Sequence, residues 1–288
     1  MIAYCKMHGL GNSFIFFDEM NGEFAHLKKP ETIRLLCDAR VGIGADGVIF
    51  MLPPRDPKHH CRMQMFNTDG SEAEMCGNAV RCLAHLFSKR QLGVSQTLIE
   101  TSSGVKEVSL VNSSQGESFY KAQMGTALFD LVATGEQLPA DRYKPLTWNE
   151  RTFEPIYVNV GNPHAVIFLK SPMSSDEMKT AGAWLETHPN HPRRINIEFV
   201  EVINRNEAKI HIWERGCGMT QACGTGATAT AAAGIKLGHF DQKVTVHMPG
   251  GELLIEQDSK GTLFMTGPVQ AICTGQLAPS LSCRLNRP

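Results

Sequence analysis

The sequence contains an internal repeat, and this feature limits the possible folds more than any other. A stretch that begins at Asn67, NTDGSEAEMCGNAVRC, is similar to a later stretch that begins at Glu214, ERGCGMTQACGTGATA. When the two are aligned on their Cys-Gly pairs, Cys76 matches Cys223 at a displacement of 147 positions, and Asn67 matches Glu214. A match of this length around one cysteine in each half indicates a duplicated structural unit.

A second pair of segments supports the duplication. Gly11-Asn12-Ser13-Phe14 resembles Gly161-Asn162-Pro163-His164 at a displacement of 150 positions, in the same order along the chain. The length of 288 residues suits two domains better than one core. We therefore expect domains at residues 1–120 and 121–266 that face one another across a cleft. The Gly/Ser-rich segment from Asn112 to Ser118 is the expected linker.

Composition excludes several classes of protein. The formal net charge is −1, with 28 Lys and Arg against 29 Asp and Glu, so no electrostatic footprint for nucleic acid or an anionic membrane is expected. No apolar run approaches the length of a membrane span, and the N-terminal residues do not have the pattern of a secretory signal. Nine cysteines are an odd number and a poor disulfide framework. A cytoplasmic protein with free thiols is the expectation.

Periodicity predicts short strands and few helices. Helices are expected at Glu31–Ala39, Asn78–Lys89, Asp176–Glu186 and Gly226–Lys236. The last of these, GATATAAAGIK, is small or apolar on nearly every side, which is typical of a helix inside a protein. The expected strands are Ile2–Lys6, Ser13–Phe17, Gly47–Met51, Cys61–Phe66, Val105–Val111, Ile156–Val160, Ala165–Leu169, Ile195–Ile203, Ala208–Trp213, Lys243–Met248 and Leu253–Glu256. Each half is thus predicted to wrap a sheet around one central helix.

Both repeated cysteines stand at the start of a predicted helix. Exposed N–H groups and the helix dipole favour anions there, so we expect a lowered thiol pKa at Cys76 and Cys223. The N–H groups of Gly77-Asn78 and Gly224-Thr225 could hold a substrate carboxylate.

Two thiols facing each other suit inversion at a carbon centre. One, as thiolate, removes a proton, and the other, as thiol, delivers a proton to the opposite face. No pyridoxal lysine site is identifiable in the sequence, so no cofactor is expected. The N–H dipoles of two helix ends would then have to stabilise the carbanion-like transition state, at about 3–4 kcal/mol per donor.

At these residues the sequence resembles the diaminopimelate epimerase family. The matching stretches are KMHGLGNSF (6–14), GIGADG (42–47), NTDGSEAEMCGNAVRC (67–82), GNPHAV (161–166), INIEFV (195–200) and ERGCGMTQACGTGATA (214–229). The resemblance implies interconversion of LL- and meso-diaminopimelate, a step towards lysine and peptidoglycan, without a cofactor. It also implies an α+β fold of two similar domains, each a curved mixed or antiparallel sheet around a central helix. The active site is expected in the cleft between the domains, the C-terminal residues 267–288 are expected to return to the first domain, and a homodimer is expected.

The resemblance also assigns roles to individual residues. It places the acid/base pair on Cys76 and Cys223, with assistance from His164 and Glu214. Substrate contacts fall on Asn12, Asn67, Gly77, Asn78, Asn162, Asn196, Glu214, Arg215, Gly224 and Thr225. Arg215 can fork onto the distal carboxylate of diaminopimelate, and the asparagines can surround the distal amine. The chain departs from the family pattern at Ser13, Gly47 and Met219, and the Gly47 change removes one distal contact that some members make.

Other readings of the same residues remain open at this point. A racemase of this fold acting on another amino acid, such as histidine, is one, and a thiol redox or metal-binding protein is another. No metal site is expected, because Cys82 and Cys217 lie six positions from Cys76 and Cys223, which is not a usual zinc spacing. Taken alone, His164 would be a structural histidine, and Glu214-Arg215 a surface ion pair. Their positions in the repeat favour the site.

Overall fold

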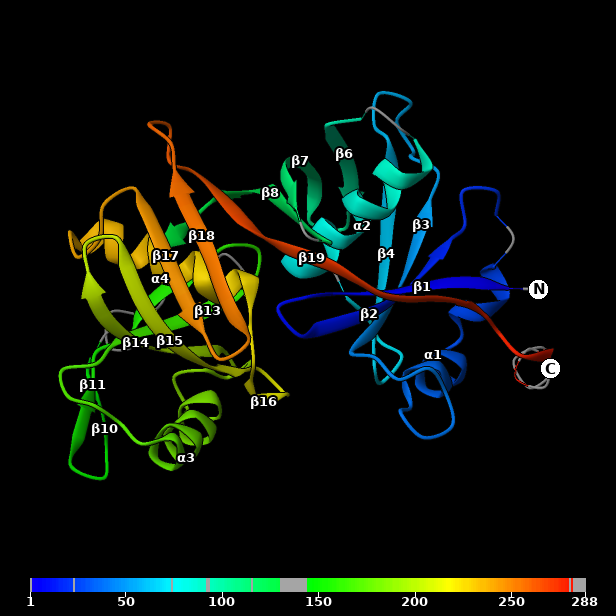
Figure 1. Cartoon of the computed structure of the whole chain (residues 1–288). Coiled ribbons are helices and arrows are strands. Elements are labelled where there is room, and N and C mark those ends of the chain that lie inside the picture. The colour runs from blue at the N-terminus through cyan, green and yellow to red at the C-terminus, as the bar shows by residue number, and fades with distance from the viewer. Residues whose placement is uncertain are drawn as a thin grey trace. The chain divides into compact units, whose positions relative to one another are not determined.

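The computed structural model describes residues 2–22, 24–73, 75–91, 94–114, 116–129, 144–279 and 281. The chain divides into two compact units. The first comprises Met1–Ala122 together with Gly267–Pro288, and the second comprises Gln123–Thr266. Strands β8 (Glu117–Thr126) and β19 (Thr262–Gln276) each run from one unit into the other (Figure 1).

The first unit is a ring of strands. Strand β1 (Ala3–Gly9) pairs with β2 (Asn12–Asp18) and β19, both antiparallel, and β2 pairs parallel with β3 (Gly47–Leu52). The order then continues through β4 (Cys61–Asn67), β6 (Gln96–Thr101), β7 (Gly104–Ser114) and β8. A pairing between β8 and β19 closes the ring among the described strands of this unit. The short β5 (Glu72–Ala73) pairs with β4.

Helix α2 (Gly77–Arg90) packs against strands from several parts of this ring, namely β1, β2, β4, β6 and β7. Its N-terminal half is buried continuously from Gly77 to Ala84, so the prediction of a central helix is confirmed for this unit. Helix α1 (Pro30–Cys37) packs on β3, and the 3-10 helix η1 (Ala25–Lys28) precedes it. Together these elements cover a second apolar core that includes Phe17, Leu36 and Phe50.

The second unit repeats the same strand order. From β9 (Leu128–Phe129) the neighbours are β12 (Ile156–Asn159), β13 (Pro163–Phe168), β14 (Asn196–Asn204), β15 (Glu207–Glu214), β17 (Lys243–Met248), β18 (Gly251–Gln257) and β19. The short β16 (Gly218–Thr220) pairs with β15. Strands β10 (Leu146–Trp148) and β11 (Arg151–Phe153) form a separate hairpin.

Helix α4 (Gly224–Leu237) occupies the position in this unit that α2 occupies in the first. It packs against β12, β13, β14, β17 and β18, and every residue from Gly224 to Gly234 is buried (Figure 1). The absence of a polar face in its sequence is explained by this burial. Helix α3 (Ser175–Glu186) packs against β14 and β15, and it begins with a capping box formed by Ser174 and Glu177.

The two units therefore share one topology. Strands β1, β2, β3, β4, β6, β7 and β8 pair in the same order and directions as β12, β13, β14, β15, β17, β18 and β19. The predicted duplication and the α+β class are confirmed.

The predicted linker is wrong. Asn112 lies in β7 and Ser118 in β8, and these two strands form a β-hairpin of the first unit in which Ser113 pairs with Ser118. Gly116 has a φ of 86° in the turn between them, a conformation that favours glycine. The Gly and Ser residues that suggested a linker belong to this hairpin. No described helix is long and apolar enough to cross a membrane.

Candidate active site

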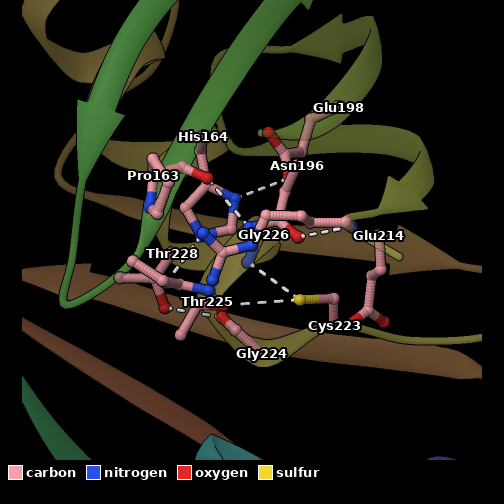
Figure 2. A network of polar contacts seen from close by, with 12 residues as sticks. Pro163, His164, Asn196, Glu198, Glu214, Cys223, Gly224, Thr225, Gly226 and Thr228 are labelled. Carbon is pink, nitrogen blue, oxygen red and sulfur yellow. Dashed lines mark hydrogen bonds and ion pairs between the residues drawn. The ribbon is translucent and has the colours of Figure 1, made fainter. Parts of the chain in front are cut away.

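Cys223 lies at the N-terminus of the buried helix α4. It is the N-cap residue, with an extended backbone conformation, and its sulfur accepts a hydrogen bond from the N–H group of Gly226 at 3.4 Å (Figure 2). The hydroxyl oxygen of Thr225 lies 3.3 Å from the same sulfur. Only 7% of Cys223 is exposed. The helix end thus surrounds this thiol with hydrogen-bonding groups in a largely water-excluded position.

The hairpin before α4 places a carboxyl group beside this thiol. Glu214 ends β15, the chain turns back into β16, and Thr220 then donates a hydrogen bond to Glu214 Oε1 at 2.5 Å. Burial raises the pKa of Glu214, against the opposing effect of the Thr220 hydrogen bond. Glu214 and Cys223 each shift the pKa of the other, so the two predicted residues are neighbours.

His164 lies behind this end of the helix and is completely buried. Its Nδ1 is 2.6 Å from Oε1 of Glu198 (Figure 2). Its Nε2 is 2.9 Å from Oδ1 of Asn162. The amide nitrogen of Asn162 in turn donates to the Thr225 hydroxyl at 3.2 Å. A continuous chain of polar contacts therefore joins the Glu198 carboxyl, through His164, Asn162 and Thr225, to the sulfur of Cys223.

Glu198 is a functional candidate that sequence reasoning missed. It lies in the centre of β14 and is fully buried, and burial raises the pKa of its carboxyl. The signal was present in the sequence, because a glutamate stands between Ile197 and Phe199 in a predicted buried strand. The parallel pairing of β13 with β14 brings it to His164.

Asn196 stabilises the loop next to this cluster. Its amide nitrogen donates to the carbonyl oxygen of Pro163 at 2.8 Å, and its side-chain oxygen accepts from the N–H group of Arg215 at 3.0 Å. These bonds tie the start of β13 to the residue that follows β15. The predicted residues His164, Asn162, Asn196, Glu214, Arg215, Cys223, Gly224 and Thr225 thus belong to one region of the second unit.

The first unit has the equivalent arrangement around Cys76. Cys76 is the N-cap residue of α2, and its sulfur lies 3.7 Å from Oδ1 of Asn12. The same oxygen accepts from the amide nitrogen of Asn78 at 3.4 Å. A buried guanidinium, that of Arg81, donates to Oδ1 of Asn78 at 2.8 Å and to the carbonyl oxygen of Gly77 at 3.2 Å. Arg81 was not identified from the sequence.

Asn67 lies at the end of β4 with its side chain exposed. Its amide nitrogen donates to the hydroxyl of Ser71 at 3.1 Å. The structure brings Cys76, Asn12, Gly77 and Asn78 into contact with one another, while Asn67 contacts the following turn instead. Asn67 is thus open to a ligand.

Two of the departures from the family pattern have local explanations. The N–H group of Ser13 donates to Oδ2 of Asp46 at 2.7 Å, so an aspartate is supplied to this position from another segment. A Cβ atom at Gly47 would lie 2.6 Å from the carbonyl oxygen of Phe66, so no larger residue fits there without a backbone shift. Met219 lies in β16, opposite Trp213, and nothing in the structure explains the methionine.

The pKa of Cys223 contradicts one expectation. Instead of falling at the helix N-terminus, it is raised well above its ordinary value of 9.0, first by burial and then by the charge of Glu214. The hydrogen bonds from Thr225 and Gly226 lower it by less. Desolvation and a neighbouring carboxylate thus outweigh the helix dipole, and Cys223 is a thiol at neutral pH.

No group of three or more His, Cys, Asp or Glu side chains suitable for a metal ion occurs among the described residues. The two matched thiols each lie at the start of a buried helix, with amide groups near Cys76 and hydroxyl and carboxyl groups near Cys223.

Comparison with known proteins gives close relatives in sequence. A family model described as diaminopimelate epimerase matches residues 4–129 and 156–272. A diaminopimelate epimerase of Halothermothrix orenii is 38% identical to this chain, over 96% of this chain and 98% of that protein. One from Methanothermobacter thermautotrophicus is 39% identical, over 96% of this chain and 99% of that protein.

Solved structures with little sequence identity share the fold. A hydroxyproline epimerase from Agrobacterium vitis, with bound trans-4-hydroxy-L-proline, is similar with a TM-score of 0.70 at 12% identity, covering 96% of this chain and 90% of that chain. A phenazine biosynthesis protein of the PhzF family from Bacillus anthracis is similar with a TM-score of 0.69 at 14% identity, covering 96% and 99%. These likenesses concern the two-unit architecture.

Proposed function

The chain belongs to the diaminopimelate epimerase family, and from this premise we propose that Cys76 and Cys223 are its two acid/base groups. The chain is an isomerase that interconverts LL- and meso-diaminopimelate. This reaction inverts one α-carbon, so a proton must leave one face of that carbon and another must arrive at the opposite face. Two groups on opposite faces achieve this without moving the substrate.

One observation carries the assignment of the two thiols. Each cysteine is the N-cap residue of the central buried helix of its unit, and the two positions are equivalent in the duplicated scaffold. In the proposed reaction a thiolate removes the α-proton and the other thiol donates its proton to the opposite face. The roles exchange in the reverse direction.

The helix ends supply the stabilisation that the reaction needs. The first N–H groups of an α-helix have no partner within the helix, and they favour negative charge. In the proposed site those of Gly77, Asn78, Gly224 and Thr225 hold the carboxylate at the reacting centre. As charge develops on the α-carbon and its carboxylate, each such donor contributes about 3–4 kcal/mol.

We propose that His164 and Glu214 assist the thiols. Support for Glu214 comes from its position next to Cys223, where each residue shifts the pKa of the other. Support for His164 comes from the polar chain through Asn162 and Thr225. The remaining proposed contacts bind the substrate, with Arg215 on the distal carboxylate and Asn12, Asn67, Asn162 and Asn196 around the polar groups.

The test uses the full-length protein and each diaminopimelate isomer separately. Cys76→Ala and Cys223→Ala are each expected to abolish interconversion. Cys217→Ser is the matched control, because Cys217 lies six positions before Cys223 and is exposed. The control should retain the wild-type rate. Interconversion at an undiminished rate in either alanine variant would refute the assignment.

Two further properties are proposed from the family resemblance, namely a homodimer and a cytoplasmic location. Sedimentation at micromolar concentration should give twice the chain mass, and a single-chain mass would contradict the first. Cell fractionation should recover the protein with cytoplasmic enzymes, and recovery from another compartment would contradict the second.

A further inference from the structure

The two halves of the duplicated scaffold bury opposite charges close to their cysteines. The strand registers establish the equivalent positions. Ile15 pairs with Val48 in the first unit, and Ala165 pairs with Ile197 in the second. Because β2 matches β13 at a displacement of 150 positions, Ile49 is the structural counterpart of Glu198.

The same comparison applies to the other positions of the site. Phe14 is the counterpart of His164, and Asn67 is the counterpart of Glu214. On the helices, which match at a displacement of 147 positions, Arg81 is the counterpart of Thr228. At each of these four positions one half has an ionisable side chain and the other half has a neutral one.

The second unit buries acidic groups. Glu198 from β14 and Glu214 from β15 both raise the pKa of Cys223 by their charge, after the larger effect of burial. His164 is the basic group within this cluster, and it faces two oxygen acceptors, Oε1 of Glu198 and Oδ1 of Asn162. Two carboxyl groups, those of Glu198 and Glu214, thus accompany this one basic side chain. A thiolate on Cys223 would add a further negative charge to this cluster.

The first unit buries a cation. Arg81 has no exposed surface, and its guanidinium bonds to the Gly77 carbonyl oxygen and to Oδ1 of Asn78, on both residues that follow Cys76. Burial lowers the pKa of Arg81 to about 10, and the charges of Cys82 and Cys76 act in the opposite direction, so the group stays charged at neutral pH. A buried positive charge favours a nearby thiolate.

We propose that this opposite charge fixes the resting state of the proposed two-thiol site, with Cys76 as the thiolate and Cys223 as the thiol. Arg81 and Glu198 are then positioning residues, since they act through the cysteines and not on the substrate. The inference rests on the proposed function of the two thiols. It adds that the free enzyme is ready to remove a proton only from the isomer whose α-hydrogen faces Cys76.

Other influences on the thiol pKa values do not reverse the proposed order, in which Cys76 ionises before Cys223. Both cysteines cap the N-terminus of a helix of the same length, so the helix dipoles do not distinguish them. The Cys223 sulfur also accepts a hydrogen bond from the Gly226 N–H group and contacts the Thr225 hydroxyl, but these lower its pKa by less than burial and the Glu214 charge raise it. The contact from Cys76 to Oδ1 of Asn12 favours the thiol form, but it is long at 3.7 Å, and a thiol is a weak donor. A full buried charge has the larger effect.

The experiment titrates the thiolate absorbance near 240 nm in the full-length wild type, in Cys76→Ala and in Cys223→Ala. The wild type and Cys223→Ala should share a titration step at or below neutral pH, and Cys76→Ala should lack it. Burial raises the pKa of Cys37 to about 11 and those of Cys61 and Cys82 to about 12, so these thiols do not contribute there. If the neutral step is absent from Cys223→Ala and present in Cys76→Ala, the proposed order is reversed and the inference fails.

Charge variants give an independent test. Mass spectrometry can follow alkylation by iodoacetamide at Cys76 and Cys223 separately. The rate at each thiol depends on pH, and the midpoint of this dependence reports the pKa of that thiol. A change in accessibility alone alters the rate but not the midpoint. Glu198→Gln should lower the Cys223 midpoint by about one pH unit, a tenfold change in thiolate fraction, and leave the Cys76 midpoint unchanged. Arg81→Gln should raise the Cys76 midpoint, and Arg81→Lys should restore it.

The failure of this inference is distinguishable from failure of the proposed function. If both alanine variants lose epimerisation but Glu198→Gln leaves the Cys223 midpoint in place, the two thiols act as proposed and the buried charges do not set their order. If either alanine variant retains epimerisation, the two-thiol function itself is wrong. Should Arg81→Gln fail to fold, the Glu198→Gln midpoint and the 240 nm titration still decide the question.

Discussion

Replacing Gly226 by alanine tests whether the site depends on close contact between helix α4 and the Glu198 carboxyl. Gly226 is the third residue of α4. A Cβ atom there would lie 2.9 Å from Oε1 of Glu198 and 3.2 Å from Cδ1 of Ile212. The same Oε1 makes the 2.6 Å contact with Nδ1 of His164. The added methyl group therefore displaces the atom that holds the histidine.

The magnitude follows from two opposing effects on the free energy of unfolding. Alanine in place of glycine stabilises a helix by about 1 kcal/mol. Overpacking a closed interior costs about 1–3 kcal/mol. The net loss of stability should be about 1 kcal/mol, whereas the epimerisation rate should fall by about tenfold or more, because the His164–Glu198 contact is disturbed.

A double variant separates the two effects. Ile212→Val removes the methyl group at 3.2 Å but leaves the Glu198 contact in place. Combined with Gly226→Ala it should recover part of the stability, measured by urea denaturation, without recovering the rate. A Gly226→Ala protein as active as the wild type would refute the packing argument, whatever its stability.

Three further predictions concern single groups. Thr220→Val removes the hydrogen bond that lowers the pKa of Glu214. The epimerisation rate should therefore fall about tenfold and the pH–rate profile should move to higher pH, and an unchanged profile would contradict a role for this hydrogen bond. Gly234→Ala places a Cβ atom 2.0 Å from the phenylalanine ring six residues later, and urea denaturation should show a loss of about 2 kcal/mol, with no loss arguing against this packing. Burial would raise the pKa of Glu100, but hydrogen bonds from the 55–59 loop lower it to about 2. Because a depressed pKa stabilises the fold above the unfolded value of 4.5, the stability gap between wild type and Glu100→Gln should be full at pH 7 and close as pH falls towards 2; a gap that is independent of pH would be evidence against this linkage.

The sequence allowed the duplication, the central helices and the paired cysteines to be predicted, because each depends on local patterns that recur. Helix α4 has no polar side, and this alone indicated its burial. Strands β8 and β19 were not predicted. In β8 the polar Ser118 is on the buried side and the apolar Phe119 is on the other side, so the usual alternation of a strand is not visible. Strand β19 contains Gly267-Pro268, residues that are rare within strands.

Two site residues, Glu198 and Arg81, were missed for a different reason. The effect of Glu198 and Arg81 depends on what lies across a sheet or beneath a helix, and no local pattern gives this information. The predicted lowering of the Cys223 pKa was wrong for the same reason, namely that the neighbours of the helix end were not known. The helix dipole alone would lower this pKa, whereas burial and two carboxyl groups from neighbouring strands raise it.

The central claim is that two different thiols act on opposite faces of one α-carbon. Epimerisation of LL-diaminopimelate in deuterated water, stopped after a small fraction of conversion, tests it most directly. The claim predicts deuterium at the inverted carbon of the meso product and none in the remaining LL substrate, because the incoming proton comes from a thiol that had exchanged with solvent. Product that retains the original hydrogen would show that a single group removes and returns the same proton, and would contradict the two-thiol account.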